Sequence, residues 1–212
     1  MDVLKQISEF LRNGDDEKVF ELTGRAIAQN IPPKDILDNG LISGMNIVGE
    51  QFSKHEIFLP EVLLAAKAMY AGMELLKPLL IKDEIPTMGK IVIGTVHGDL
   101  HDLGKNLVGI MLKGAGFEVI DLGKDVPAEK FVETAEEEDA KIIGMSALLT
   151  TTMPVMKSVT DLLKERGLDG AIKTIIGGAP VSEEFAREIG ADVYAYDAAK
   201  AVDCVKQLTG TK

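Results

Sequence analysis

The feature that most constrains the fold is a change of hydrophobic period at Lys90. From that residue onward, short runs of aliphatic residues alternate with stretches of helical spacing. The runs are apolar throughout, which is typical of strands that are buried on both faces of a parallel sheet. We therefore expect an α/β domain over residues 90–212 with a doubly wound, five-stranded parallel sheet. The expected strands are KIVIGTV, FEVIDL, KIIGMSAL, KTIIGG and ADVYA.

Residues 1–81 follow a different pattern, because their apolar side chains recur at the spacing of amphipathic helices. Four helices fit this part of the chain. Asn13-Gly14-Asp15 indicates a helix end followed by an N-cap, while Pro32-Pro33 and Pro60 can each begin a helix. The polar stretch at residues 82–89 is expected to be a linker between the helical domain and the α/β domain.

Charge and composition argue against several partners and locations. The net charge of −11 is unsuited to nucleic acid or an anionic membrane, because both need a concentrated basic surface. No stretch approaches the roughly 20 apolar residues that cross a bilayer, and MDVLKQISEF is unlike a signal peptide. We therefore expect a cytoplasmic protein. The single cysteine, Cys204, excludes an internal disulfide and a multi-thiolate metal site.

The loop after the first expected strand is unusually rich in ionisable side chains. It reads Gly94-Thr95-Val96-His97-Gly98-Asp99-Leu100-His101-Asp102-Leu103-Gly104-Lys105-Asn106. Ligands of doubly wound sheets bind beyond the carboxyl ends of the strands. This loop and the loops after Met145 and Ile176 are therefore the expected location of a functional site.

A phosphate-binding loop is one interpretation, because Gly98 and Gly104-Lys105 are arranged somewhat like its glycines and lysine. However, five residues separate the two glycines instead of four, and Asn106 replaces the hydroxyl residue that holds magnesium. The nearby carboxylates would also repel a phosphate.

Two other interpretations remain open. A zinc or iron hydrolase site could take its ligands from the two histidines and two aspartates at 97–102. The difficulty is to complete the ligand set, since the only other histidine, His55, lies in the helical half. Alternatively, His101 is an ordinary satisfied loop histidine and Asp99 is a helix cap.

A fourth interpretation follows from the pattern Asp99-x-His101-x-x-Gly104. It closely resembles the cobamide-binding signature of the corrinoid proteins of methyltransferase systems and of the cobalamin module of methionine synthase. The resemblance implies a flavodoxin-like or Rossmann-like sheet and a cobamide (cobalamin or a related corrinoid) whose cobalt has His101 as its lower axial ligand. It also implies that Asp99 fixes the tautomer of His101 and that Gly104 leaves room for the displaced nucleotide tail. The other cofactor neighbours in this loop would be Gly98, Leu100 and Asp102.

Two further loops match the same family pattern. Ser146-Ala147-Leu148 follows the third strand, and the hydroxyl groups of Thr150 and Thr152 are expected to bond the nucleotide and the Asp–His pair. Gly177-Gly178 follows the fourth strand, where missing side chains would let the tail lie against the backbone. Ala198 is expected to line the same site. Each loop alone could be an ordinary turn, but together they occupy neighbouring positions that a single ligand would touch.

The helical domain resembles the cap that covers the upper corrin face in this family. The residues that carry this resemblance include Gly44-Met45-Asn46, Phe58-Leu59-Pro60-Glu61 and Met69. Most of its apolar side chains must form the core of the helical bundle. Phe58 and Met69 are the two that we expect to contact the corrin.

The resemblance implies a methyl carrier with no catalytic residue of its own. The cobalt would accept a methyl group as Co(I) from a substrate-specific methyltransferase that acts on methylamines, betaines, methanol or methoxylated aromatics. As methyl-Co(III) it would methylate tetrahydrofolate or coenzyme M through a second methyltransferase. A corrinoid reductive activator would be a third partner. Methylamine- or betaine-type systems are preferred.

Two alternatives share the cobamide signature. One is a cobamide-binding sensor, but the acidic N-terminal helices give no support for an attached DNA-reading module. The other is the small subunit of a radical mutase, and residues 1–80 argue against it because those subunits usually lack a four-helix cap.

Overall fold

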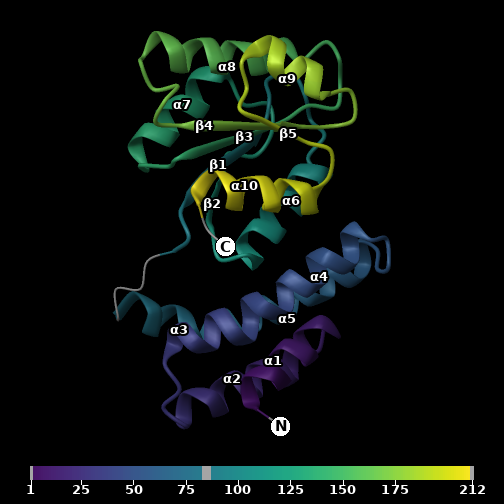
Figure 1. Ribbon diagram of the computed structural model, residues 1–212, viewed down its shortest axis with the longest axis vertical. Helices are drawn as coiled ribbons and strands as arrows, with labels where there is room; N and C mark the ends of the chain where they lie inside the picture. Colours follow the sequence, from purple (N-terminus) through teal and green to yellow (C-terminus); the bar gives the residue numbers. More distant parts are fainter. Residues whose placement is uncertain (1, 83–86, 211–212) are drawn as a thin grey trace. The chain divides into compact units, whose positions relative to one another are not determined.

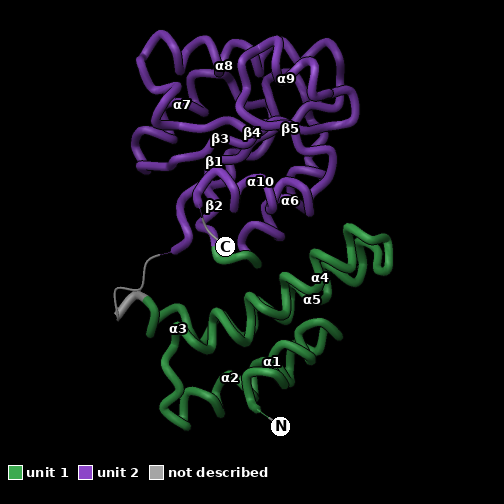
Figure 2. The backbone as a smooth tube through the Cα atoms, in the orientation of Figure 1, with its two compact units in different colours: residues 1–86, 114–116 green, residues 87–113, 117–212 purple. Residues whose placement is uncertain are grey.

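The structure is a computed structural model that describes residues 2–82 and 87–210. The chain divides into two compact units, residues 1–86 with 114–116 and residues 87–113 with 117–212 (Figure 2). Half of the linker expected at 82–89 lies outside the described residues, since 83–86 are not among them.

Four helical segments form the described part of the first unit, as the sequence predicts. They are α1 (Val3–Arg12), α2 (Asp16–Ala28), the uninterrupted series α3 (Pro33–Ile36), η1 (Leu37–Ile42) and α4 (Ser43–Ser53), and finally α5 (Leu59–Lys82). The expected N-cap is present at α2, where the carboxylate of Asp15 accepts a hydrogen bond from the backbone N–H of Lys18. Pro33 begins α3, where a missing N–H has no cost.

Two irregularities of these helices have no clear sequence signal. The segment η1 is π-helical, so its extra residue per turn shifts which side chains face the bundle. Helix α5 continues through Pro78, although proline removes a backbone donor.

Gly44 lets α4 approach α1 closely, because a Cβ atom on Gly44 would lie 3.1 Å from the carbonyl oxygen of Ser8.

The second unit is built on a parallel sheet with the strand order β2-β1-β3-β4-β5. This confirms the predicted doubly wound, five-stranded architecture, and the order is the flavodoxin-like one. The strands are β1 (Lys90–Thr95), β2 (Glu118–Asp121), β3 (Ile142–Ser146), β4 (Lys173–Gly177) and β5 (Val193–Ala195). The central strands β1, β3 and β4 are mostly buried, whereas the edge strand β2 is partly exposed.

Helices cover both faces of this sheet (Figure 1). Helices α7 (Ala128–Glu137), α8 (Pro154–Glu165) and α9 (Glu183–Ile189) lie on one face, and α6 (Leu103–Gly114) and α10 (Ala198–Thr209) on the other. The helix that follows β1 and the helix that follows β3 therefore cover opposite faces. This change of side creates a crevice beyond the carboxyl ends of β1 and β3, where such sheets bind ligands.

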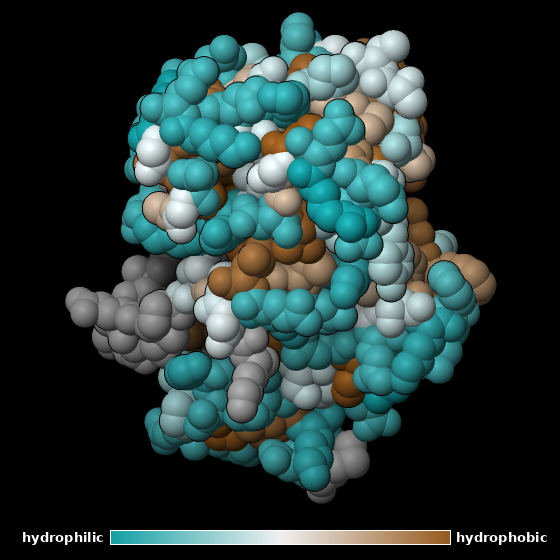
Figure 3. Space-filling model, turned by 45° about the horizontal axis from the view of Figure 1, so that its top comes forward, coloured by the Kyte–Doolittle hydropathy of each residue, from teal (hydrophilic) through white to brown (hydrophobic). Residues whose placement is uncertain are grey.

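Hydrophilic residues cover most of the face shown in Figure 3, with a few areas of exposed apolar side chains. Among the residues that the structure describes, no helix is both long and apolar enough to cross a membrane.

Candidate cofactor site

The three loops selected from the sequence follow three neighbouring strands, β1, β3 and β4. Backbone hydrogen bonds continue the pairing just past the strand ends. The N–H of Val96 donates to the carbonyl oxygen of Ser146 at 3.0 Å, and the N–H of Ala147 donates to that of Gly177 at 3.2 Å. The loops that carry the Asp-x-His, Ser-x-Leu and Gly-Gly elements therefore adjoin one another.

Asp99 and His101 form the centre of this loop cluster. Asp99 is fully buried, whereas the side chain of His101 is 53% exposed. The Nδ1 atom of His101 lies 2.7 Å from Oδ1 of Asp99, and the same oxygen accepts the backbone N–H of His101 at 3.0 Å. Because a carboxylate can only accept, this contact places the proton of the neutral imidazole on Nδ1. The lone pair is then on Nε2, where a metal can bind it.

The other carboxylate oxygen of Asp99 is held by the loop after β3. It accepts hydrogen bonds from the backbone N–H groups of Leu148 at 2.6 Å and Leu149 at 3.1 Å, and from the hydroxyl group of Thr152 at 3.2 Å. Burial alone would raise the pKa of Asp99, but the hydrogen bonds from His101, Leu148 and Leu149 outweigh it and lower the pKa well below its ordinary value. The interpretation of Asp99 as a helix cap is therefore wrong, because its partners lie outside the first turn of α6.

Sequence reasoning missed two groups that fix this pair. Thr95, which is fully buried at the end of β1, donates its hydroxyl hydrogen bond to the carbonyl oxygen of His101 at 3.0 Å. The backbone N–H of Leu149 is the other group. A hydroxyl residue at the end of an otherwise apolar strand was the available signal for Thr95, whereas a backbone donor leaves no trace in the sequence.

The glycines of the three loops differ in whether the surrounding backbone requires them. Gly104 is exposed, and a Cβ atom on it would meet nothing within 4 Å. Gly178 has φ +129°, and a Cβ atom there would lie 1.8 Å from the carbonyl oxygen of Ala147. A Cβ atom on Gly177 would lie 2.9 Å from the carbonyl oxygen of Ala195. Gly178 and Gly177 are therefore required by the packing of the loops themselves, and only Gly104 borders free space.

The remaining residues of the β1–α6 loop serve its conformation. Gly98 has φ +81° and donates its N–H to the Oδ1 atom of Asp125 at 2.7 Å. The carbonyl oxygen of Asp102 accepts the N–H of Asn106 at 2.8 Å and so begins α6. These observations explain both residues without a ligand, and a cofactor contact by either one stays a prediction.

Exposed leucines occur on the loop after β1, at the start of α6, and on the loop after β3 that bonds to Asp99. The exposed fractions are 62% for Leu100, 69% for Leu103, 44% for Leu148 and 40% for Leu149. Large apolar side chains clustered at a surface indicate a binding site rather than a solvated loop. Such side chains suit contact with a large, partly apolar ligand such as a corrin.

The other predicted neighbours differ in accessibility. Thr150 is exposed, Ser146 is half-buried at the end of β3, and Ala198 is buried at the start of α10. In the helical unit Phe58 is 65% exposed, whereas Met69 is 4% exposed. Burial makes Met69 a core residue in this structure, and corrin contact by either side chain stays a prediction.

The donor set distinguishes between the metal-site interpretations. Residues 2–82 and 87–210 contain no group of three or more His, Cys, Asp or Glu side chains that could hold a metal ion. His97 does not converge with His101, because its Nδ1 atom pairs with Oδ1 of Asp125 at 2.7 Å. A zinc or iron hydrolase site is therefore not supported. A corrin would itself supply four nitrogen ligands to cobalt and would need only the single imidazole that His101 offers, so the residues present fit a cobamide.

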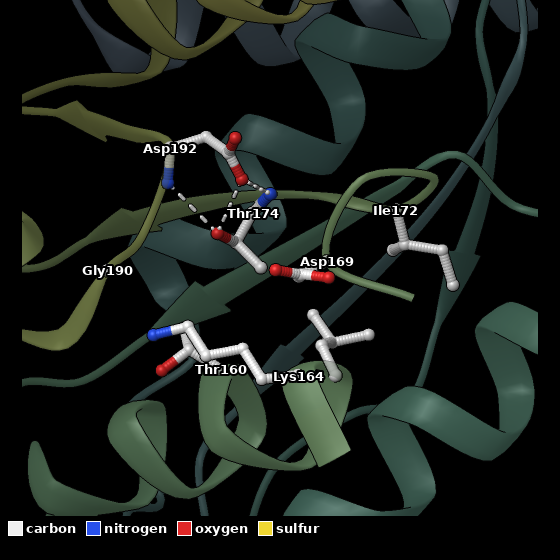
Figure 4. Close-up of a pocket in the computed structure, with 8 residues that line it drawn as sticks. Thr160, Lys164, Asp169, Ile172, Thr174, Gly190 and Asp192 are labelled. Carbon is white, nitrogen blue, oxygen red and sulfur yellow. Dashed lines mark hydrogen bonds between the residues drawn. The ribbon is translucent and has the colours of Figure 1, made fainter. Parts of the chain in front are cut away.

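A separate hollow of about 200 Å³ lies at the opposite edge of the sheet, near the amino ends of β4 and β5 (Figure 4). Two of its polar residues are bonded to each other, since Asp192 accepts hydrogen bonds from the backbone N–H of Thr174 at 2.8 Å and from its hydroxyl group at 3.0 Å. This hollow is away from the carboxyl ends of the strands and has no part in the site around His101.

Comparisons with known proteins agree with this geometry. Residues 89–204 match a B12 binding domain, and residues 3–77 match a second B12 binding domain model. Trimethylamine corrinoid protein 1 of Methanosarcina mazei is 44% identical over 207 residues, which is 97% of this chain and 96% of that protein. Dimethylamine corrinoid protein 1 of Methanosarcina acetivorans is 50% identical over 179 residues, 84% of each chain.

Two solved structures share the fold over nearly the whole chain. One is the methanol:cobalamin methyltransferase complex of Methanosarcina barkeri, with a TM-score of 0.87, 32% identity, and coverage of 99% of this chain and 80% of that one. The other is a cobalamin-binding protein of Desulfitobacterium hafniense, with a TM-score of 0.81, 34% identity and 98% coverage of both chains. With two B12-binding matches and relatives at this level of identity, the chain belongs to the family of cobamide-binding corrinoid proteins.

Proposed function

We propose that this protein is a methyl carrier that binds its cobamide through His101 and exchanges the methyl group with partner methyltransferases. The observation that carries the proposal is the orientation of His101, whose Nδ1 atom is bonded to the buried Asp99 while its side chain is 53% exposed. When bound, the cobamide supplies a cobalt centre that can accept and release a methyl group. The protein controls the ligand below the cobalt and the access of partners.

Asp99 controls the ligand by holding a proton on one ring nitrogen. With Nδ1 fixed as a donor to Asp99, the lone pair of Nε2 remains available for the metal. The Asp99–His101 hydrogen bond thereby decides which ring nitrogen His101 would offer to the cobalt.

The partners follow from relatives and from the two units. Several relatives are named for trimethylamine or dimethylamine, at 42 to 50% identity, which supports a methylamine as the methyl donor. The structural similarity to a protein of a methanol:cobalamin methyltransferase complex supports a methyltransferase as the direct partner. The proposal also includes a second methyltransferase for tetrahydrofolate or coenzyme M and a reductive activator.

The proposal assigns residues 1–81 to a cap over the upper corrin face and residues 90–212 to the cobamide-binding domain. Separate B12 binding domain matches at 3–77 and 89–204 support that division. A cytoplasmic location also belongs to the proposal. It is supported by the lone buried cysteine, Cys204, because secreted proteins of this size commonly rely on disulfides.

Methylation of the reconstituted protein tests this function. The holo-protein is supplied with a reductant and with a methyltransferase specific for monomethylamine, dimethylamine or trimethylamine, together with the matching amine. We expect methylation, followed by the visible spectrum, only when one of these enzymes and its amine are both present. Efficient demethylation by the isolated holo-protein would contradict the carrier function, and methylation by a methanol-specific enzyme alone would contradict the choice of donor.

A further inference from the structure

A buried lysine lies beside the His101 loop and has no role in the contacts described above. Lys105 is in the first turn of α6, directly after Gly104, and is 5% exposed. Its Nζ atom lies 2.6 and 2.7 Å from the two carboxylate oxygens of Asp121 at the end of β2, and 2.7 Å from Oδ1 of Asn106. Lysine is seldom buried, and a positive charge is unfavourable at the start of a helix. The stability of α6 alone therefore does not explain this residue.

The ion pair is one end of a series of hydrogen bonds that leads to His101. Oδ1 of Asp121 also accepts the backbone N–H of Gly123 at 2.8 Å, and the carbonyl oxygen of Gly123 accepts the N–H of Thr95 at 2.9 Å. The hydroxyl group of Thr95 then donates to the carbonyl oxygen of His101. The loop 96–102 is thus anchored at its start by Thr95 and just after its end by Lys105. Both anchors are tied to residues 121–123.

We propose that Lys105 and Asp121 are positioning residues that hold the His101 loop in its cofactor-ready conformation before the cobamide arrives. The inference rests on the proposed ligation of cobalt by His101. Lys105 Nζ makes three hydrogen bonds, two to Asp121 and one to Asn106, and together these fix its position, whereas an apolar pair of the same volume would only fill space. Without the pair, the loop has to become ordered during binding, which slows association and lowers the fraction of His101 that reaches the cobalt.

Four variants separate this role from a merely structural one. Lys105→Met removes the charge and keeps the length of the side chain, and Lys105→Arg keeps the charge. The double variant Lys105→Met/Asp121→Leu removes the whole ion pair, a change that is often neutral or stabilising for a fold. Lys173→Met is the matched control, because it breaks a lysine–aspartate pair of 3.0 Å with Asp192 at the opposite edge of the sheet.

The experiment compares three measurements on these variants. They are the association rate of methylcobalamin by stopped flow, the protein-derived nitrogen coupling in the Co(II) EPR spectrum, and the hydrogen exchange of the Asp99 and His101 amides in the apo-protein. We expect Lys105→Met and the double variant to associate about 10-fold more slowly, the factor that corresponds to about 1.4 kcal/mol. Hydrogen exchange at the Asp99 and His101 amides should be faster in both variants. We expect this even if the double variant has the same unfolding temperature as the wild type. Lys105→Arg and Lys173→Met should keep the wild-type rate.

The inference is overturned if the double variant has wild-type stability and also the wild-type association rate and amide exchange. The ion pair would then contribute neither to the order of the loop nor to cofactor binding. A wild-type protein without nitrogen coupling from the protein would instead refute the ligation by His101. The amide exchange of the apo-protein would still decide whether Lys105 and Asp121 order the loop.

Discussion

Replacing Asp99 by asparagine should change the tautomer of His101 and weaken cobamide binding, while the protein still folds. The buried carboxylate accepts two hydrogen bonds from His101 on Oδ1 and three from Leu148, Leu149 and Thr152 on Oδ2. An amide has a single acceptor oxygen. We expect it to face Leu148, Leu149 and Thr152, because they provide three donors. The NH₂ group of the asparagine then faces His101. The backbone N–H of His101 loses its acceptor, and Nδ1 has to accept a hydrogen bond instead of donating one, which moves the ring proton to Nε2.

The expected size of the effect follows from those contacts. One unsatisfied buried N–H costs about 1–3 kcal/mol of folding free energy. The altered tautomer carries its proton on Nε2, which is the nitrogen that binds the metal. Loss of a carboxylate that orients a metal-binding histidine commonly lowers metal affinity about 10–100-fold, and we expect a loss of cobamide affinity in that range for Asp99→Asn.

The assay combines two measurements on the same preparation. Nitrogen-15 NMR of the apo-protein reports which ring nitrogen of His101 carries the proton, and a spectrophotometric titration with methylcobalamin gives the dissociation constant. Asp99→Glu is the control, because it retains a carboxylate but displaces it by one methylene group. If Asp99→Asn keeps the Nδ1 proton and the wild-type affinity, the proposed role of Asp99 is wrong.

The remaining predictions concern pH, the glycines and the cofactor tail. Because the folded-state pKa of Asp99 is lowered, its contribution to stability is full above the unfolded pKa of about 3.9 and is lost as the pH falls below it; thermal melts of apo-protein should show the gap between wild type and Asp99→Asn closing in acid. Gly104→Leu should leave the apo-protein at least as stable, since glycine costs a helix about 0.5–1 kcal/mol, yet weaken cobamide binding by filling free space. Gly178→Ala should lower apo-protein stability first, because its Cβ atom would collide with the carbonyl oxygen of Ala147; equal effects of both glycine variants on stability would refute this distinction.

Most of the fold could be predicted because it depends on local periodicity. Apolar runs located the five strands, and the alternation with helices placed the Asp-x-His, Ser-x-Leu and Gly-Gly elements at one edge of the sheet. The π-helical segment η1 was missed, since the sequence at 37–42 keeps an ordinary helical spacing.

The site was less predictable where its contacts join residues far apart in the chain. Asp99 bonds to Leu148 and Leu149, which are 49 and 50 positions away, through backbone groups that have no sequence signature. The pairing of Lys105 with Asp121 spans 16 positions and crosses from a helix to a strand. Gly178 and Gly104 also look alike in the sequence, and only the backbone geometry separates a packing requirement from an open space.

The most direct test of the account is the Co(II) EPR spectrum of protein reconstituted with cobamide, recorded with and without nitrogen-15 labelling of the protein. Ligation by His101 predicts a nitrogen hyperfine coupling that changes with the label and disappears in His101→Ala. His97→Ala is the matched control and should keep the coupling, because His97 is paired with Asp125. A label-dependent coupling that persists in His101→Ala would contradict the assignment of the lower cobalt ligand.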